Sequence, residues 1–89
     1  MNFFHMLTME QKFIIETLKD KTCYCMFYGK VCVIDFKSAV VALSEDKILI
    51  SEASFSIAAI TEFQIGYGEH EVQIVLKFET QTLEIRASR

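Results

Sequence analysis

Three cysteines and two histidines are the residues of this 89-residue chain whose chemistry could serve a metal site or a nucleophile. Cys23, Cys25 and Cys32 lie in an apolar stretch, whereas His5 and His70 are distant from them in the sequence. Structural zinc sites usually show paired C-x2-C knuckles, and a C-x-C inside an apolar strand is typical of cysteines that pack as small hydrophobic residues. Only two lysines lie close enough in sequence to lower a thiol pKa. We therefore expect reduced core cysteines, no metal ligands and no cysteine nucleophile.

Two further titratable residues stand out by their neighbours. Asp35 interrupts an apolar run, but Asp is rarely fully buried, so we expect it to face solvent at a strand bend. His70 is flanked by Glu69 and Glu71, and this setting favours a solvated loop histidine. The sequence contains no Gly-rich phosphate loop, no Ser/His/Asp spacing and no nucleotide fingerprint. We therefore predict that the protein is not an enzyme and that it needs no cofactor.

The charges are unevenly distributed along the chain. The formal net charge of -3 argues against a general phosphate binder, because such proteins usually carry a basic face. Residues 45–71 hold six acids and a single base, and these acids form the predicted acidic face: Glu45, Asp46, Glu52, Glu62, Glu69 and Glu71. Two interpretations remain open. The acids form an ordinary solvated surface, or they attract a basic partner or the more basic half of a second copy.

Residues 22–43 should organise the fold, because their apolar side chains fall on both parities of a strand. Such a segment needs cover on both faces, from a closed barrel, a helix or another subunit. Gly29-Lys30 is the main turn signal inside it. Either a tight hairpin or a sharp bend in one long strand fits this signal. Two-residue hairpins favour Asn-Gly or Asp-Gly, so we expect the bend.

A short helix is predicted to precede this segment. Thr8 and Gln11 have the spacing of a capping box, which marks a helix start. Apolar residues at three- and four-residue spacing then predict the buried stripe Met9, Phe13, Ile14, Thr17 and Leu18. Residues 1–7 extend this apolar surface or form an N-terminal arm.

The second half of the chain reads as strands. We expect a strand over residues 47–51, and a strand over residues 55–65 interrupted by one helical turn near Ala58 and Ala59. Residues 66–70 contain two glycines and should form the most mobile internal loop. Residues 72–78 and 83–87 alternate between apolar and polar side chains, which predicts a final amphipathic hairpin with one wet face.

These elements predict a single α+β domain over residues 1–89. An N-terminal helix would pack on a strongly bent antiparallel β-sheet or on a small barrel of five to seven strands. Every charge-free stretch is far shorter than the roughly 18 residues of a membrane span. The amino terminus lacks the basic region of a secretion signal. We therefore expect no membrane association and a cytoplasmic location.

One segment resembles a known family. Gly29-x5-Asp35, followed by Val40-Val41-Ala42-Leu43, is similar to the second and third strands of the Sm-like family of small SH3-like barrels. The resemblance implies a barrel and a ring-like oligomer. The family's base-binding Asn is replaced here by Ala39, and the basic residue of its second motif by Ile65 before Gly66. The resemblance therefore does not extend to the RNA pocket. Bacterial PH-like domains share a similar strand rhythm, but they end in a helix.

The sequence favours a protein that works through contacts with other proteins. Its surplus of apolar surface is large for a small domain, and the predicted interaction surface comprises Tyr24, Met26, Tyr28 and Phe36. We expect a homodimer or small ring, with a foreign protein as the alternative partner. An oligomerising adaptor and an inhibitor of a larger protein both fit, as among accessory proteins of phages and mobile elements. An Sm-like nucleic-acid binder, which the charge disfavours, and a small-ligand barrel remain alternatives.

Overall fold

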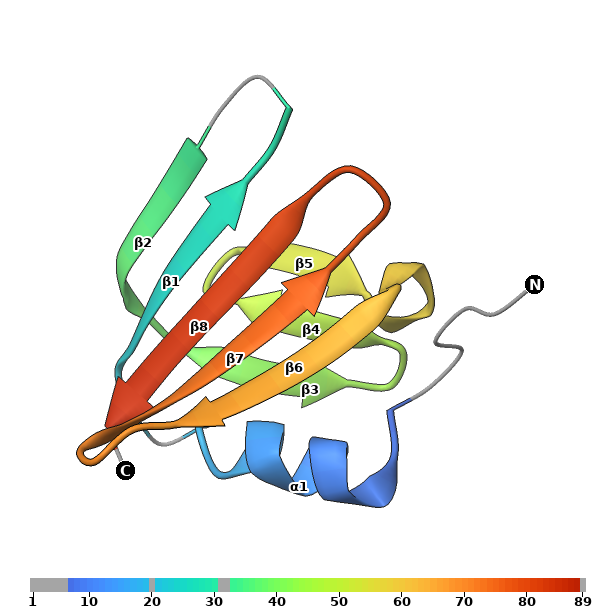
Figure 1. Ribbon diagram of the computed structural model, residues 1–89. Helices are drawn as coiled ribbons and strands as arrows, with labels where there is room; N and C mark the ends of the chain where they lie inside the picture. The colour runs from blue at the N-terminus through green and yellow to red at the C-terminus, as the bar shows by residue number, and fades with distance from the viewer. Residues whose placement is uncertain (1–6, 20, 31–32, 89) are drawn as a thin grey trace.

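The computed structural model describes residues 7–19, 21–30 and 33–88, and this part of the chain forms one helix and eight strands (Figure 1). The elements in chain order are α1 (Met9–Glu16), β1 (Cys23–Tyr28), β2 (Val33–Ala39), β3 (Val41–Ser44), β4 (Lys47–Ile50), β5 (Ala53–Ser56), the 3-10 helix η1 (Ile57–Ala59), β6 (Glu62–Tyr67), β7 (Glu71–Lys77) and β8 (Thr82–Ser88). The prediction of a helix with antiparallel strands is confirmed, and the strand number exceeds the five to seven expected.

The strands form two sheets rather than a barrel. The large sheet has the order β2-β1-β8-β7-β6, and the small sheet has the order β3-β4-β5. Figure 1 shows the small sheet behind the large one, with α1 below both and beside β3. Of the two alternatives expected, a bent antiparallel sheet and a small barrel, the described strands do not form the barrel. The chain leaves the large sheet at Val40, where the amide of Ser51 donates to the Val40 carbonyl at 2.8 Å, so β3 pairs with β4 instead of continuing the first sheet.

The prediction that residues 22–43 form one long bent strand is wrong. β1 and β2 pair antiparallel, with Tyr28 opposite Val33, and β3 then belongs to the other sheet. The argument against a hairpin concerned two-residue loops, whereas residues 29–32 separate these two strands. A longer connection does not require Asn-Gly, so Gly29 alone could not decide between a bend and a hairpin.

The core lies between the two sheets. Alternate residues of β7 and β8 face it, and Ile74, Leu76, Leu83 and Ile85 are fully buried, which confirms the predicted amphipathic hairpin. The small sheet contributes Val41, Ile48 and Ile50 to the same single cluster of buried side chains. Each such side chain stabilises the fold by roughly 1.5–3 kcal/mol relative to an exposed one. The Phe55 ring lies 5.2 Å from Phe27 and 6.0 Å from Phe78, measured between centroids.

Helix α1 starts where its capping box predicted. The Gln11 amide donates to the Thr8 hydroxyl at 3.1 Å, and the Thr8 amide donates to the Gln11 side chain at 2.9 Å. The predicted stripe is wrong at Met9 and Phe13, which are 87% and 69% exposed, and it is confirmed at Leu18, which is buried. Ile15, and Leu7 before the helix, are buried although they lay outside the predicted stripe. Apolar residues occupy two faces of this helix, and the face with Ile15 lies toward the core.

Two local predictions in the second half can be compared with the structure. The interrupted strand is confirmed, since η1 lies between β5 and β6. The loop expected over residues 66–70 is shorter, because Gly66 lies in β6 opposite Gln73. The turn is tied by the Gly68 amide, which donates to the Glu71 carbonyl at 2.8 Å. Neither Gly66 nor Gly68 has a positive φ, so the glycines are not required there by backbone geometry.

Candidate interaction surface

The face of the large sheet that points away from the small sheet carries an aromatic patch on β1 and β2. Tyr28 lies opposite Val33, and Met26 lies opposite Asp35. Residues directly opposite each other in an antiparallel pair share a face, and alternate residues of a strand return to it. Tyr24, Met26 and Tyr28 therefore lie on the outer face together with Val33, and we call these four residues the β1–β2 patch. Tyr24, Tyr28 and Val33 are 36%, 37% and 60% exposed.

Phe36 lies on the opposite face, which separates it from the other three residues predicted for the interaction surface. It pairs with Cys25, which is fully buried, and its half-buried side chain packs against the core. The prediction treated residues 22–43 as one strand, so it grouped Phe36 with Tyr24, Met26 and Tyr28 by parity. The β1–β2 pairing reverses this parity, because even-numbered residues of β1 oppose odd-numbered residues of β2 at Tyr28 and Val33. Val33 was missed for the same reason.

Charged groups border the β1–β2 patch. The Tyr24 hydroxyl donates to a carboxylate oxygen of Asp35 at 3.4 Å, and Arg86 lies opposite Tyr24 on β8. Desolvation by neighbouring groups and the Asp35 carboxylate raise the pKa of the Tyr24 hydroxyl, against the opposing influence of Arg86. Asp35 is exposed, as predicted. An apolar centre with a polar rim is the usual composition of a protein interface.

Strand β2 is an edge strand with little cover. It pairs with β1 alone in the large sheet, so half of its backbone N–H and C=O groups face away from the sheet. Ile34, on its inner face, is 44% exposed, and Ala39 is the only fully buried residue of the strand. The register with β1 shifts between Cys23 and Cys25, so the regular part of β2 ends before Ala39. Native proteins often blunt exposed edges with such irregularities.

The six acidic residues predicted to form one face are distributed over separate parts of the molecule. Glu45 and Asp46 form the turn between β3 and β4, whereas Glu69 lies in the turn between β6 and β7. Figure 1 shows these two turns at opposite ends of the fold. Glu52 follows β4, and Glu62 and Glu71 begin β6 and β7. Acids that are close in sequence were carried apart by the reversals of the sheet, so no single acidic face unites all six.

The cysteines that the structure describes are core residues. Cys23 and Cys25 are 1% and 0% exposed, as predicted, and Cys32 lies outside the described residues. Burial, together with a smaller influence of the neighbouring Cys23, raises the pKa of the Cys25 thiol to about 12. A thiol with so high a pKa is a poor nucleophile at neutral pH. Within residues 7–19, 21–30 and 33–88, no three His, Cys, Asp or Glu side chains group as metal ligands.

His70 lies in the β6–β7 turn, where the sequence placed it, and its ring is 3.3 Å from a carboxylate oxygen of Glu69. Both side chains are almost fully exposed, so this contact contributes little to stability. His5 lies outside the described residues. Of the histidines and cysteines considered for chemistry, His70 and Cys23 line the same open hollow, but Cys23 is buried whereas His70 is almost fully exposed.

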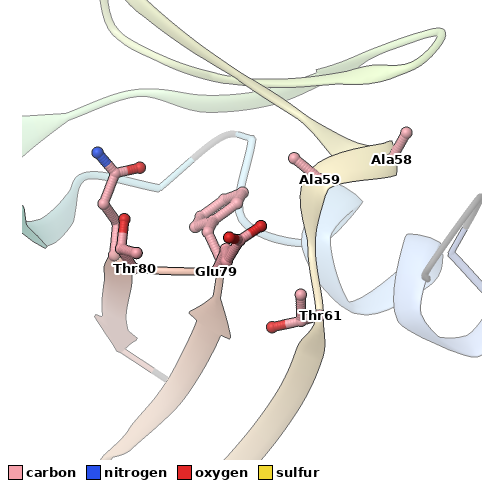
Figure 2. Close-up of a pocket in the computed structure, with 7 residues that line it drawn as sticks. Ala58, Ala59, Thr61, Glu79 and Thr80 are labelled. Atoms are coloured by element: carbon pink, nitrogen blue, oxygen red, sulfur yellow. The ribbon is translucent and has the colours of Figure 1, made fainter. Parts of the chain in front are cut away.

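Three of the hollows on the surface of the described residues bear on the site. A groove of about 300 Å³ lies between η1 and the β7–β8 loop, and Figure 2 shows Ala59 and Thr61 on one side of it and Glu79 and Thr80 on the other. A second groove of about 260 Å³ lies between α1 and the large sheet, lined by Phe13, Ile14, Thr17, Lys21, Tyr67 and Val72. The third, of about 370 Å³, is polar and extends from Tyr24 and Lys37 to His70 and Arg86. All three are open to solvent, unlike the enclosed pockets that bury most of a small ligand.

No helix in the described residues has the length and apolar character needed to cross a membrane. Comparisons with protein-family models, with curated proteins and with solved structures found no match for this chain.

Proposed function

We propose that this protein is a non-enzymatic interaction module that binds a partner protein through its β1–β2 hairpin. The observation that carries the proposal is the position of the β1–β2 patch directly beside the open edge of β2. Tyr and Met are enriched at the centres of protein interfaces, and an open edge can add a strand from a partner. An adaptor and an inhibitor would both use such a surface.

The distribution of reactive groups supports a binding role over catalysis. The described cysteines are buried with raised thiol pKa values, and His70, which lines the same polar hollow as Cys23, is an almost fully exposed residue of a turn. Catalytic sites bring a nucleophile, a base and a group that orients the base within hydrogen-bond reach in a concave pocket. Tyr24 donates to Asp35 at the end of a hollow that is open to solvent, and both side chains are exposed.

Affinity capture from the source cells tests this proposal. The wild-type chain and the variant Tyr28→Asp serve as baits, because a carboxylate at the centre of the β1–β2 patch opposes burial of that patch. We expect the variant to lose the partner that the wild type retains. Tyr67→Asp is the matched control, since Tyr67 is an exposed tyrosine on β6, at the far edge of the large sheet. Equal capture by all three baits would reject the β1–β2 patch as the binding surface.

The two alternative functions give different signals. An Sm-like nucleic-acid binder would shift RNA in a gel, with an affinity that falls steeply as salt rises. A small-ligand protein would show a thermal shift in a metabolite screen. Either result, together with equal capture of proteins by Tyr28→Asp and the wild type, would favour that alternative over the proposed function.

A further inference from the structure

We propose that the partner at the open edge of β2 is the β2 strand of a second copy of this chain, paired antiparallel about Phe36. This inference rests on the proposed function, because it assigns an occupant to the same hairpin. Two large sheets would then join edge to edge, with both β1–β2 patches on one continuous outer face.

The sequence of β2 is self-complementary in this register. With Phe36 opposite Phe36 of the second copy, Asp35 of each copy lies opposite Lys37 of the other, which gives two pairs of opposite charge. Asp35 and Lys37 are both exposed in the single chain, and Asp35 accepts only the long hydrogen bond from the Tyr24 hydroxyl among the contacts described above.

Other symmetric registers are less favourable. Centring the pair on Asp35 places Asp35 opposite Asp35 of the second copy, and centring it on Lys37 places lysine opposite lysine. Like charges directly opposite each other destabilise a strand pair. A register centred between two residues would place outer-face side chains of one copy opposite inner-face side chains of the other, which the pleat of the sheet does not allow. Only the register about Phe36 gives both charged residues of β2 an opposite charge.

The other described edges lack this feature. β6, the other edge of the large sheet, has Glu62 as its only charged residue, so it cannot form pairs of opposite charge with a copy of itself. The edges of the small sheet, β5 and β3, have no charged residue, and β3 also lies beside α1. A copy of β2 is therefore the partner whose chemistry this edge specifies. The register with β1 is irregular after Phe36, where Lys37 and Ser38 have no partner in β1, so we expect a short ladder and a weak dimer that forms as concentration rises.

Charge reversal tests the register. Sedimentation velocity over a series of concentrations would compare the wild type with Asp35→Lys, Lys37→Asp and the double variant that carries both changes. Each single change converts two attractive pairs into two repulsive ones and should weaken the dimer about tenfold. The double variant restores opposite charges and should regain the wild-type affinity. Glu62→Lys, on the other edge strand of the large sheet, is the matched control and should leave the dimer unchanged.

The outcomes separate this inference from the proposed function. A 10.3 kDa species at every concentration would overturn the dimer, whereas the capture experiment with Tyr28→Asp would still decide the proposed function. The register would be overturned if the single charge reversals left the dimer affinity unchanged, or if the double variant dimerised as weakly as the single variants. Thermal melts followed by circular dichroism show that each variant is folded. A merely structural role of Asp35 or Lys37 would lower the melting temperature without rescue of association in the double variant.

Discussion

The β1–β2 and β7–β8 hairpins belong to the same sheet but differ in how they use their side chains. In β8, every second residue from Leu83 to Ala87 is buried, and the strand has a partner on each side. In β2, Ala39 alone is fully buried and one edge is open. Burial of alternate residues stabilises the fold, whereas exposed apolar residues at an edge favour contact with other molecules. The comparison therefore assigns stability to β7–β8 and recognition to β1–β2.

The largest expected difference between the hairpins comes from matched isoleucine truncations. Ile85→Ala should lower the free energy of unfolding by roughly 2–5 kcal/mol, because Ile85 is fully buried between the sheets. Ile34→Ala should cost less than about 1 kcal/mol, since Ile34 is 44% exposed. Urea unfolding followed by circular dichroism measures both. Similar costs at the two positions would mean that β2 contributes to the core as much as β8 does.

A smaller loss of stability is expected on substitution of Cys25, a buried residue of β1. Cys25→Ser should destabilise the fold by roughly 1–3 kcal/mol, because the hydroxyl would be buried without a hydrogen-bond partner. Cys25→Ala, which adds no polar group, is the control and should cost less. Added zinc should not change either unfolding curve. Stoichiometric metal that is lost on the Ser substitution would contradict the assignment of Cys25 to the core.

The raised thiol pKa of Cys25 predicts a pH dependence of stability. The folded-state pKa of about 12 exceeds the ordinary value of 9.0, so the unfolded chain releases the proton first. The contribution of Cys25 is therefore fully present below pH 9 and is lost progressively as the pH rises toward 12. Unfolding free energies measured between pH 8 and 10 should fall less steeply in Cys25→Ala than in the wild type. Parallel slopes would show that this thiol is not desolvated.

The smallest effect concerns the β1–β2 patch itself. Tyr28→Asp should change the unfolding free energy of the single chain by about 0.5 kcal/mol or less, because Tyr28 lies on the open sheet face. Chemical denaturation at low protein concentration measures this value without interference from association. A loss comparable to that of Ile85→Ala would show that the patch is structural, and it would contradict the division between the two hairpins.

Local patterns in the sequence predicted several elements correctly. The capping box fixed the start of α1, alternation identified β7 and β8, and mixed spacing around Ala58 and Ala59 indicated the interruption between β5 and β6. Each of these signals lies within a few neighbouring residues. The helix face was not predictable in the same way, because α1 has apolar residues on two sides and only its contact with β3 selects Ile15.

The arrangement of the candidate surface depends on contacts that a single sequence does not reveal. The chain switches sheets at Val40, whose carbonyl accepts a hydrogen bond from Ser51, a residue that follows a different strand. Phe36 changes face with the number of residues in the connection before it, so a wrong turn assignment moved it to the wrong side. Tyr24, Met26 and Tyr28 were grouped correctly because they share one strand. The distribution of the acidic residues likewise followed from the strand order.

The pairing of β1 with β8 has a consequence for how the molecule assembles. These two strands come from opposite ends of the described chain and lie side by side in the middle of the large sheet, flanked by β2 and β7 (Figure 1). During synthesis on the ribosome, β8 is made after β1 and β7, so the sheet becomes continuous only when β8 has been added. Contacts between residues so distant in sequence raise the contact order and slow folding. Nascent chains that end before Thr82 would therefore display β1 and β7 as additional unpaired edges, the form in which this protein is most exposed to aggregation.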